Sequence, residues 1–217
     1  MNKDSINANL IANKEWNKTY DNLWDKEIKY DDWLDSFKEY IENTNKPIID
    51  LGCGFGNDTL YLRKMGKEVI PCDYSEIAIK NVKENFPDIK RVECFDMTKG
   101  LPFTDNCTDV VIADLTLHYF TKEDTFMILD EIKRVLNKGG VLFLRVNSVE
   151  DVNHGAMQGE EIEHHLFKTS DGRYKRFFDE DDIDFFFKDW KKLYVNEESM
   201  KRYKEEKILW KCAFVQL

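Results

Sequence analysis

The feature of this sequence that most restricts its fold is an alternation of apolar and amphipathic segments between residues 47 and 147. Five apolar segments read as strands: PIIDL, EVIPCD, KRVECFD, DVVIADL and VLFLRVN. Between them, apolar residues recur at helical spacing, and we predict helices that start at Asn57 or Asp58, at Ser75 and at Thr121, the last of them ending at Gly139 and Gly140. Continuous apolar strands separated by such helices predict a parallel sheet covered on both faces.

The two ends of the chain follow other patterns. Aromatic and aliphatic residues at helical spacing predict two helices before the first strand, one around Trp16, Tyr20 and Trp24 and one around Trp33 to Ile41. Beyond the fifth strand, Asp171-Gly172 predicts a hairpin whose acidic arm (residues 160–163) faces a basic arm (residues 173–176). KKLYVNE and ILWKCAFVQL read as two closing strands, which makes seven in all.

Size and charge narrow the class of protein. A length of 217 residues suits one sizeable domain, and 42% hydrophobic residues suit a soluble globular one. The net charge of −10 argues against a broad nucleic-acid-binding face. No apolar run approaches the roughly 18 residues of a membrane span, and the N-terminus lacks a signal-peptide core, so we expect a cytoplasmic protein.

The stretch IIDLGCGFGND, residues 48–58, reads as a strand, a glycine-rich turn and a helix start. Such a turn lets a ligand approach the backbone closely. The spacing and the missing lysine exclude a P-loop, and Asn57 stands where a dinucleotide loop wants its third glycine. Asp50 precedes the first glycine by two residues, where we expect its carboxylate to point toward the ligand. This charge favours a ligand with a cationic end.

DLGCGFG, together with three later aspartates at strand ends, resembles the class I S-adenosylmethionine-dependent methyltransferases. The later marks are VIPCDYS, ECFDMTKGLPF and VIADLTLHYF, followed by RVLNKGGVLFL. The resemblance implies a Rossmann-like α/β fold with a seven-stranded, mostly parallel sheet, helices on both faces and an antiparallel last strand. Within the family, the chain is loosely similar to tellurite-resistance and thiopurine methyltransferases.

The resemblance also implies a binding site for S-adenosylmethionine, with S-adenosylhomocysteine as product. Asp50, Gly52, Cys53 and Gly54 would hold the methionine end, and Asp73 with Tyr74 the ribose. Asp96 would accept from the adenine amino group and Met97 would pack on its ring. Asp114 and Leu115 would face the reacting methyl group, and Trp16 and Tyr20 would cover the cofactor, shielding its sulfonium by cation–π attraction. We read Cys53 as filling space and not as a nucleophile.

For the methyl acceptor, the sequence offers candidates and no assigned base. The acceptor-side candidates are Asp114, His118, Tyr119, Arg145, Asn147, His154 and Arg176. Two adjacent histidines, His164 and His165, point to opposite faces of a strand, so we expect no metal site. We expect one methyltransferase domain over residues 1–217, made of an N-terminal helical cap (1–45), a cofactor-binding core (46–147), a variable acceptor-side insertion (148–178) and a closing part (179–217).

Three functions remain open at this point. The first is methyl transfer to a small-molecule acceptor, without nucleic-acid or membrane partners. The second is a protein methyltransferase, and the third is a non-catalytic S-adenosylmethionine-binding protein. Composition and motifs leave the acceptor atom and the oligomeric state undetermined.

Overall fold

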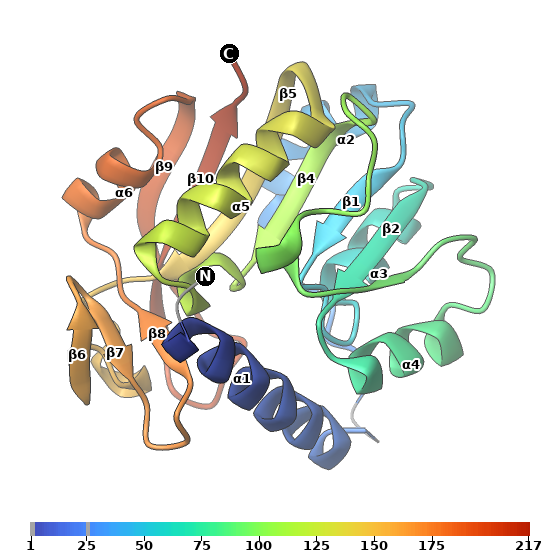
Figure 1. Cartoon of the computed structure of the whole chain (residues 1–217). Coiled ribbons are helices and arrows are strands. Elements are labelled where there is room, and N and C mark those ends of the chain that lie inside the picture. The colour runs from blue at the N-terminus through green and yellow to red at the C-terminus, as the bar shows by residue number, and fades with distance from the viewer. Residues whose placement is uncertain (1–2, 25–26) are drawn as a thin grey trace.

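The computed structural model describes residues 3–24 and 27–217. Within these residues, seven strands form one sheet in the order β3-β2-β1-β4-β5-β10-β9 (Figure 1). The strands are β1 (Ile48–Leu51), β2 (Val69–Asp73), β3 (Glu93–Cys94), β4 (Thr108–Asp114), β5 (Leu136–Asn147), β9 (Lys191–Met200) and β10 (Lys207–Val215). Strands β1 to β5 are parallel, and β10 is antiparallel to both of its neighbours. The predicted Rossmann-like sheet with an antiparallel last strand is therefore confirmed.

Helices cover both faces of this sheet. The α-helices are α1 (Lys3–Asn22), α2 (Lys38–Asn43), α3 (Asn57–Lys64), α4 (Glu76–Asn85), α5 (Lys122–Val135) and α6 (Glu180–Phe186). Short 3₁₀ helices are η1 (Trp33–Phe37), η2 (Met97–Lys99), η3 (Leu117–Tyr119) and η4 (Val152–His154). Helices α5 and α6 pack on one face, and η1, α2 and α3 pack on the other.

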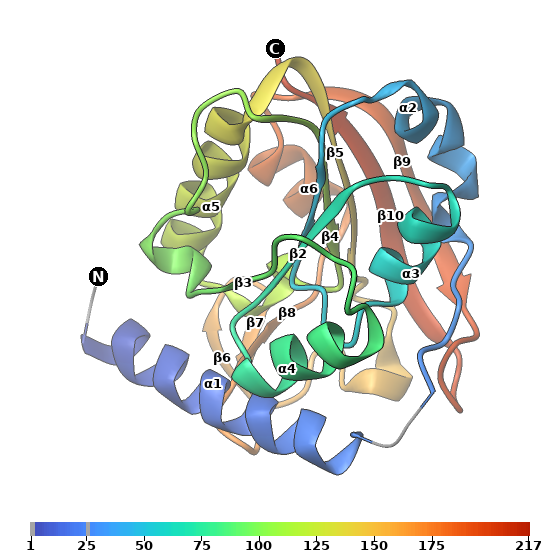
Figure 2. The same cartoon turned by 90° about the vertical axis from the view of Figure 1, so that its right-hand side faces the viewer.

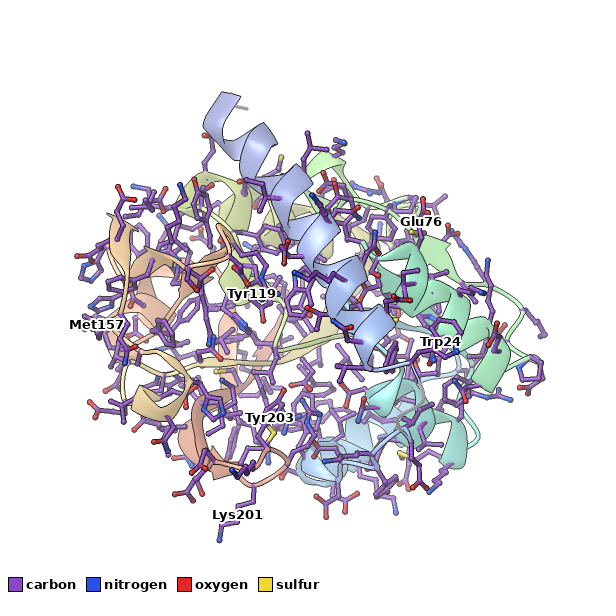
Figure 3. The ribbon with its side chains drawn as sticks, turned by 90° about the horizontal axis from the view of Figure 1, so that it is seen from below. Trp24, Glu76, Tyr119, Met157, Lys201 and Tyr203 are labelled. Atoms are coloured by element: carbon purple, nitrogen blue, oxygen red, sulfur yellow. The ribbon has the colours of Figure 1, made fainter. Side chains whose placement is uncertain are left out.

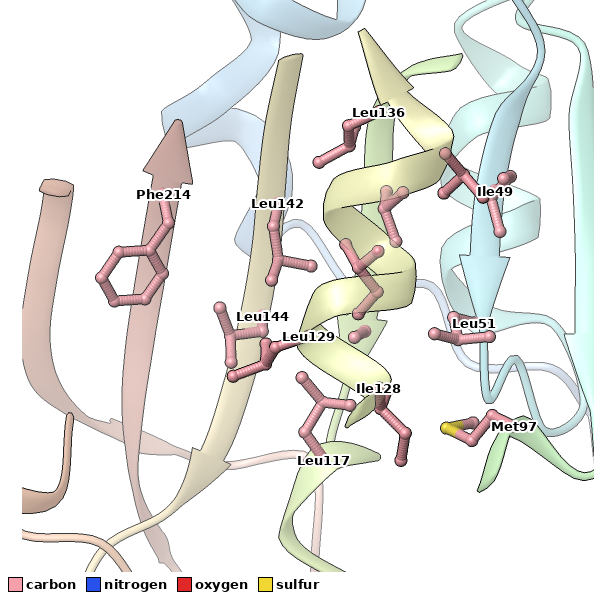
Figure 4. Close-up of a cluster of buried hydrophobic side chains, with 14 of the residues drawn as sticks. Ile49, Leu51, Met97, Leu117, Ile128, Leu129, Leu136, Leu142, Leu144 and Phe214 are labelled. Atoms are coloured by element: carbon pink, nitrogen blue, oxygen red, sulfur yellow. The ribbon is translucent and has the colours of Figure 1, made fainter. Parts of the chain in front are cut away.

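The strands are buried on both faces, as their continuous apolar sequences predict. In β5, for example, Leu142 and Leu144 belong to the core under α5, whereas Val141 and Phe143 belong to the core under α2 and α3 (Figure 4). Ser75 accepts a hydrogen bond from the N–H of Ala78 and caps α4, as predicted. Thr121 caps α5 in the same way. These local signals set the starts of both helices.

Three boundaries differ from the prediction. Helix α5 ends at Val135, and Gly139 and Gly140 lie within β5 instead of ending the helix. A Cβ on Gly140 would lie 2.8 Å from the carbonyl oxygen of Asn137, so this glycine allows a close backbone approach. The third strand has only two residues, and the second N-terminal helix is the short η1 followed by α2.

The segment after β5 forms a small second sheet, with the order β6 (Glu160–Glu163), β7 (Leu166–Lys168), β8 (Tyr174–Arg176). The Asp171-Gly172 turn joins β7 to β8. The acidic arm β6 pairs with β7 and not with the basic arm, which corrects the single-hairpin prediction. Arg176 nevertheless reaches Glu163 across the sheet at 2.6 Å.

Helix α1 runs along the edge of the sheet at which the parallel strands end (Figures 1 and 2). In an open α/β sheet, ligands bind at this carboxyl edge, where the strand order reverses. Here the reversal lies between β1 and β4, which are hydrogen-bonded neighbours. The fold therefore places the glycine-rich turn and the later strand ends beneath α1.

Candidate functional site

The turn after β1 depends on glycine for its conformation. Gly52 has φ of 76°, and a Cβ there would lie 2.1 Å from Oγ1 of Thr116. Gly54 has φ of 54°, and a Cβ there would lie 3.0 Å from the hydroxyl of Tyr20. Since L-residues with side chains rarely adopt such φ values, glycine lets the turn pass tightly between η3 and α1.

A cavity of about 720 Å³ opens beside this turn. This volume falls in the range of small-molecule sites, roughly 300–1,000 Å³. Several predicted site residues line the cavity: Trp16, Tyr20, Gly52, Cys53, Gly54, Asp114, Leu115, His118, Tyr119, Asn147 and His154. Others do not line it: Asp50, Asp73, Tyr74, Asp96, Met97, Arg145 and Arg176.

Carboxylates gather beneath the glycine turn. Asp50 is 1% exposed and accepts a hydrogen bond of 2.6 Å from the hydroxyl of Thr59. Burial, together with Asp114 and Asp73, raises the pKa of Asp50 to about 7. Its carboxylate thus lies under the turn and not in the cavity, which corrects the expectation that it points at the ligand.

Asp58, in the first turn of α3, lies in the cavity wall. Its Oδ1 accepts a hydrogen bond of 2.8 Å from the indole N–H of Trp33, and it forms no ion pair among the described residues. Burial and then the charges of Asp114 and Asp50 raise its pKa well above the usual value. A cationic ligand group beside Asp58 would compensate this buried carboxylate.

Asp114, at the end of β4, already has cationic partners. Arg145 donates to it through Nε at 2.6 Å and through a terminal nitrogen at 2.8 Å, and Arg202 approaches at 3.4 Å. Arg145 also pairs with Asp31 at 2.8 Å. Arg145 is therefore a buried structural link rather than the acceptor-side residue that we expected.

The residues expected at the adenosine end lie under α1. The backbone N–H groups of Gly54 and Ser75 donate to the two carboxylate oxygens of Asp73, at 2.9 and 2.8 Å. Asp96 caps η2 by accepting from Thr98. Met97 is 6% exposed and packs in the hydrophobic core beside Leu51 (Figure 4).

Asparagines on α1 bind this part of the edge directly. The amide of Asn13 donates to the carbonyl of Tyr74 at 2.8 Å, and Asn17 accepts from the hydroxyl of Ser75 at 2.5 Å. Asn9 donates to Thr98 at 3.1 Å. Helix α1 therefore covers Asp73 and Asp96, neither of which lines the cavity in this structure.

The aromatic residues of α1 pack among themselves and on the turn. Trp16 stacks on Tyr20 at 5.7 Å between ring centroids and meets Tyr119 edge-on at 5.1 Å. Arg173 lies 4.4 Å over the ring of Trp16. Seen from below, α1 crosses the molecule and Tyr119 and Tyr203 lie on the same side of it (Figure 3). We expected the sulfonium of the cofactor as the cation–π partner of Trp16, and in this structure Arg173 occupies that role.

Two predicted residues that line the cavity are buried without full partners. His118 is 1% exposed and its Nδ1 has no hydrogen-bond partner. Asn147 is 0% exposed and neither its amide nitrogen nor its oxygen is paired. Arg176 lies away from the cavity, where it donates to Glu163 and to the carbonyl of His164.

The sequence interpretation missed Asp58, Lys175, Arg202 and Lys207, all in the cavity wall. Asp58 could have been found from the sequence, because it is an acidic residue in the first turn of the helix that follows the glycine turn. The three cations carry no such signal, since Lys175 comes from the insertion, Arg202 from the loop between β9 and β10, and Lys207 from the start of β10.

His164 and His165 also differ from expectation. They lie in the turn between β6 and β7, where His165 has φ of 56° and the two rings stack at 3.8 Å. With Asp179 and Asp182 they form a group whose potential ligand atoms all lie within 4.8 Å of one another. Asp179 and Asp182 are at the same time the capping box of α6. The two histidines therefore share one side and do not face apart.

The site fits S-adenosylmethionine on its own geometry. Gly52 and Gly54 line the cavity, and beside them Asp58 offers a buried carboxylate that has no ion pair among the described residues. No helix in the described part of the chain is long and apolar enough to cross a membrane.

Comparison with known proteins agrees with this geometry. Residues 49–144 match the family model described as a methyltransferase domain. The chain is 30% identical over 149 residues to the tRNA N(3)-methylcytidine methyltransferase Mettl2 of Drosophila melanogaster, covering 64% of this chain and 46% of that protein. The chain thus spans about half the length of the curated relatives that it matches.

Two solved structures share the fold. One is a 1,6-didemethyltoxoflavin-N1-methyltransferase from Burkholderia thailandensis, solved with 1,6-didemethyltoxoflavin and S-adenosylhomocysteine, with a TM-score of 0.74 at 14% identity, covering 98% of this chain and 90% of that one. The other is TehB from Haemophilus influenzae, with a TM-score of 0.64 at 17% identity, covering 93% and 67%. Residues 49–144 thus match a methyltransferase domain, on a fold that the chain shares with solved S-adenosylmethionine-dependent methyltransferases. Its methyltransferase domain includes β1, β4 and most of β5.

Proposed function

We propose that this chain transfers a methyl group from S-adenosylmethionine to a small-molecule acceptor. The observation that carries the proposal is one continuous cavity with two chemically different ends. Its glycine-turn end holds Asp58, a carboxylate without an ion pair among the described residues. The part around His118 and Asn147, here called the far end, has buried polar atoms without hydrogen-bond partners among the described residues.

In this proposal, the glycine turn and Asp58 hold the methionine end of the cofactor, with the cofactor's ammonium next to the Asp58 carboxylate. Asp73 binds the ribose and Asp96 the adenine once α1 moves aside, since both carboxylates lie under α1 in this structure. Trp16 and Tyr20 then close over the ligand. Helix α1 would thus act as a lid.

The activated methyl group is supplied by S-adenosylmethionine, and the chain's residues supply binding and alignment. The acceptor would lie against His118 and Tyr119, in line with the methyl group. Burial, and then the nearby Lys207 and Lys175, lower the pKa of His118 well below its usual value. His118 is therefore neutral at pH 7 and offers one donor and one acceptor to the substrate.

A small acceptor is favoured because the cavity volume of about 720 Å³ lies within the range of small-molecule sites, roughly 300–1,000 Å³. Mettl2 acts on tRNA by its name, so tRNA belongs in the acceptor screen. A protein acceptor is the other alternative, and lysine-containing peptides test it.

Calorimetry with S-adenosylhomocysteine tests the cofactor half. We expect wild type to bind it and Asp58→Asn to bind about 10-fold or more weakly, since a charge-assisted contact is worth about 1.5–3 kcal/mol. Asparagine can still accept from Trp33, so the fold should persist. Asp189→Asn is the matched control, because Asp189 is exposed and away from the cavity.

Transfer of labelled methyl groups to a panel of small acids, amines, thiols, tRNA and peptides tests the reaction half. Binding of NAD in place of S-adenosylhomocysteine would refute the cofactor assignment. Labelling of tRNA or peptides alone would refute the small-molecule acceptor and leave the cofactor assignment intact.

A further inference from the structure

The far end of the cavity holds more positive charge than its carboxylates balance. Lys175 on β8 and Lys207 at the start of β10 both line it, beside the neutral His118. The carboxylate nearest to these lysines is Asp151, which is 1% exposed. Asp151 accepts from Nζ of Lys207 at 2.6 Å, from the N–H of Ile208 at 3.1 Å and pairs with Nδ1 of His154 at 2.8 Å. The oxygens of Asp151 are thus committed to other groups.

Lys175 is left without a carboxylate of its own. Its Nζ donates to the carbonyl oxygen of His154 at 2.6 Å, and it forms no ion pair within residues 3–24 and 27–217. Burial and then repulsion by Lys207 lower its pKa to about 8, against the opposing attraction of Asp151. Nζ also lies 5.0 Å over the ring of Phe177, but it has no anionic partner among the described residues. An ammonium without an anionic partner in a cationic surrounding attracts an anion.

Asn147 and His118 add unused hydrogen-bonding atoms at the same place. Both side chains are buried and line the cavity, and the unpaired atoms are the whole amide of Asn147 and Nδ1 of His118. Buried polar atoms in native proteins nearly always have a partner. A ligand between these side chains and Lys175 would supply it.

The rest of this end is aromatic. The rings of Tyr119 and Tyr203 line the cavity together with Trp16, and Tyr203 packs 5.6 Å from His154. Aromatic walls favour an apolar body of about the size of a ring, with its polar group directed at the cations.

We propose that the methyl acceptor is a small acid with a ring-sized apolar body, whose carboxylate or phosphate group binds Lys175 next to Asn147. The inference rests on the proposed methyltransferase function and deepens it, because it names the chemical class of the acceptor. The anionic group anchors the molecule and leaves its nucleophilic atom to face the methyl group.

Calorimetry on the protein saturated with S-adenosylhomocysteine tests this with three probes that share a phenyl ring: benzoate, phenyl phosphate and benzamide. We expect benzoate or phenyl phosphate to bind at least about 10-fold more tightly than benzamide. The tighter of the two acids identifies the oxyanion. In Lys175→Met the preference for the acid should disappear, while benzamide binding stays unchanged.

Two further variants separate charge from folding. Lys175→Arg keeps a cation and should keep the preference for the acid. Lys168→Met removes an exposed lysine from the neighbouring strand and should behave as wild type. Equal binding of acid and amide by wild type, or an unchanged preference in Lys175→Met, would overturn the inference. With S-adenosylhomocysteine binding intact, that result leaves the methyltransferase function standing, whereas loss of that binding in wild type refutes the function itself.

Discussion

Replacing Arg145 with methionine would test whether a buried charge cluster stabilises the fold beside the site. Arg145 is 3% exposed and donates to Asp114 at 2.6 and 2.8 Å and to Asp31 at 2.8 Å. Its guanidinium lies 4.6 Å over the ring of Trp33. It therefore ties the end of β4 to the segment between α1 and η1.

The cost follows from what remains after the change. Removing one partner of a buried ion pair costs about 3–5 kcal/mol, because the other charge stays buried. Arg202 remains at 3.0 Å from Asp31 and 3.4 Å from Asp114, so neither carboxylate loses every cation. We therefore expect the lower end, a loss of about 3 kcal/mol in the free energy of unfolding. In a double-mutant cycle, Asp114→Asn should cost less in the Arg145→Met background than in wild type, and the difference between the two costs should be about 2 kcal/mol.

The pH dependence of the free energy of unfolding tests the same charge cluster independently. Burial alone would raise the pKa of Asp114, but Arg145 and then Arg202 lower it below its usual value. A depressed pKa stabilises the fold above the unfolded value of about 3.9, and this stability is lost as the pH falls through the folded pKa. In Arg145→Met the pKa of Asp114 rises instead. The stability difference between wild type and variant should thus shrink as the pH falls from about 7 to about 5.

Urea denaturation followed by tryptophan fluorescence measures these differences. The control is Lys90→Met, which breaks an exposed pair with Glu68 and should cost below about 1 kcal/mol. A loss for Arg145→Met no larger than for this control would refute the reasoning. So would a loss that is independent of pH, since it would come from packing on Trp33 and not from charge.

Three more predictions concern the site. Gly52→Ala should destabilise the fold by about 1–3 kcal/mol and abolish S-adenosylhomocysteine binding, whereas Gly155→Ala, with φ of 86° and open space around it, should keep binding; calorimetry and thermal melts decide this. Benzoate affinity should fall as the pH rises above about 8, because Lys175 loses its proton there; the charged groups that face it are Lys207 on β10, Arg173 just before β8 and Asp151 before η4. A pH-independent affinity would contradict this. Asn17→Ala removes the hydrogen bond from Ser75 and should speed S-adenosylhomocysteine association about fivefold in stopped-flow fluorescence; an unchanged rate would argue against α1 as a lid.

Much of the fold could be read from local sequence. The start of α4 follows from Ser75 and that of α5 from Thr121, because a capping side chain acts within its own turn. The end of α5 could not, because Gly140 is required by a contact between backbones and not by a helix cap. His164 and His165 were misplaced for a similar reason, since a turn with positive φ replaces the expected strand.

The sequence by itself determined the seven-stranded Rossmann-like sheet, the glycine turn and the aspartates at strand ends, because hydrophobic periodicity and turn chemistry act over a few residues. Only the tertiary structure decided which charges meet. Arg145 pairs with Asp31, 114 residues away, and Lys207 pairs with Asp151, 56 residues away. Those pairings leave Asp58 and Lys175 without ion pairs among the described residues, and burial makes an uncompensated charge attract a ligand. The cationic end of the cofactor and the anionic group proposed for the acceptor both follow from that arrangement.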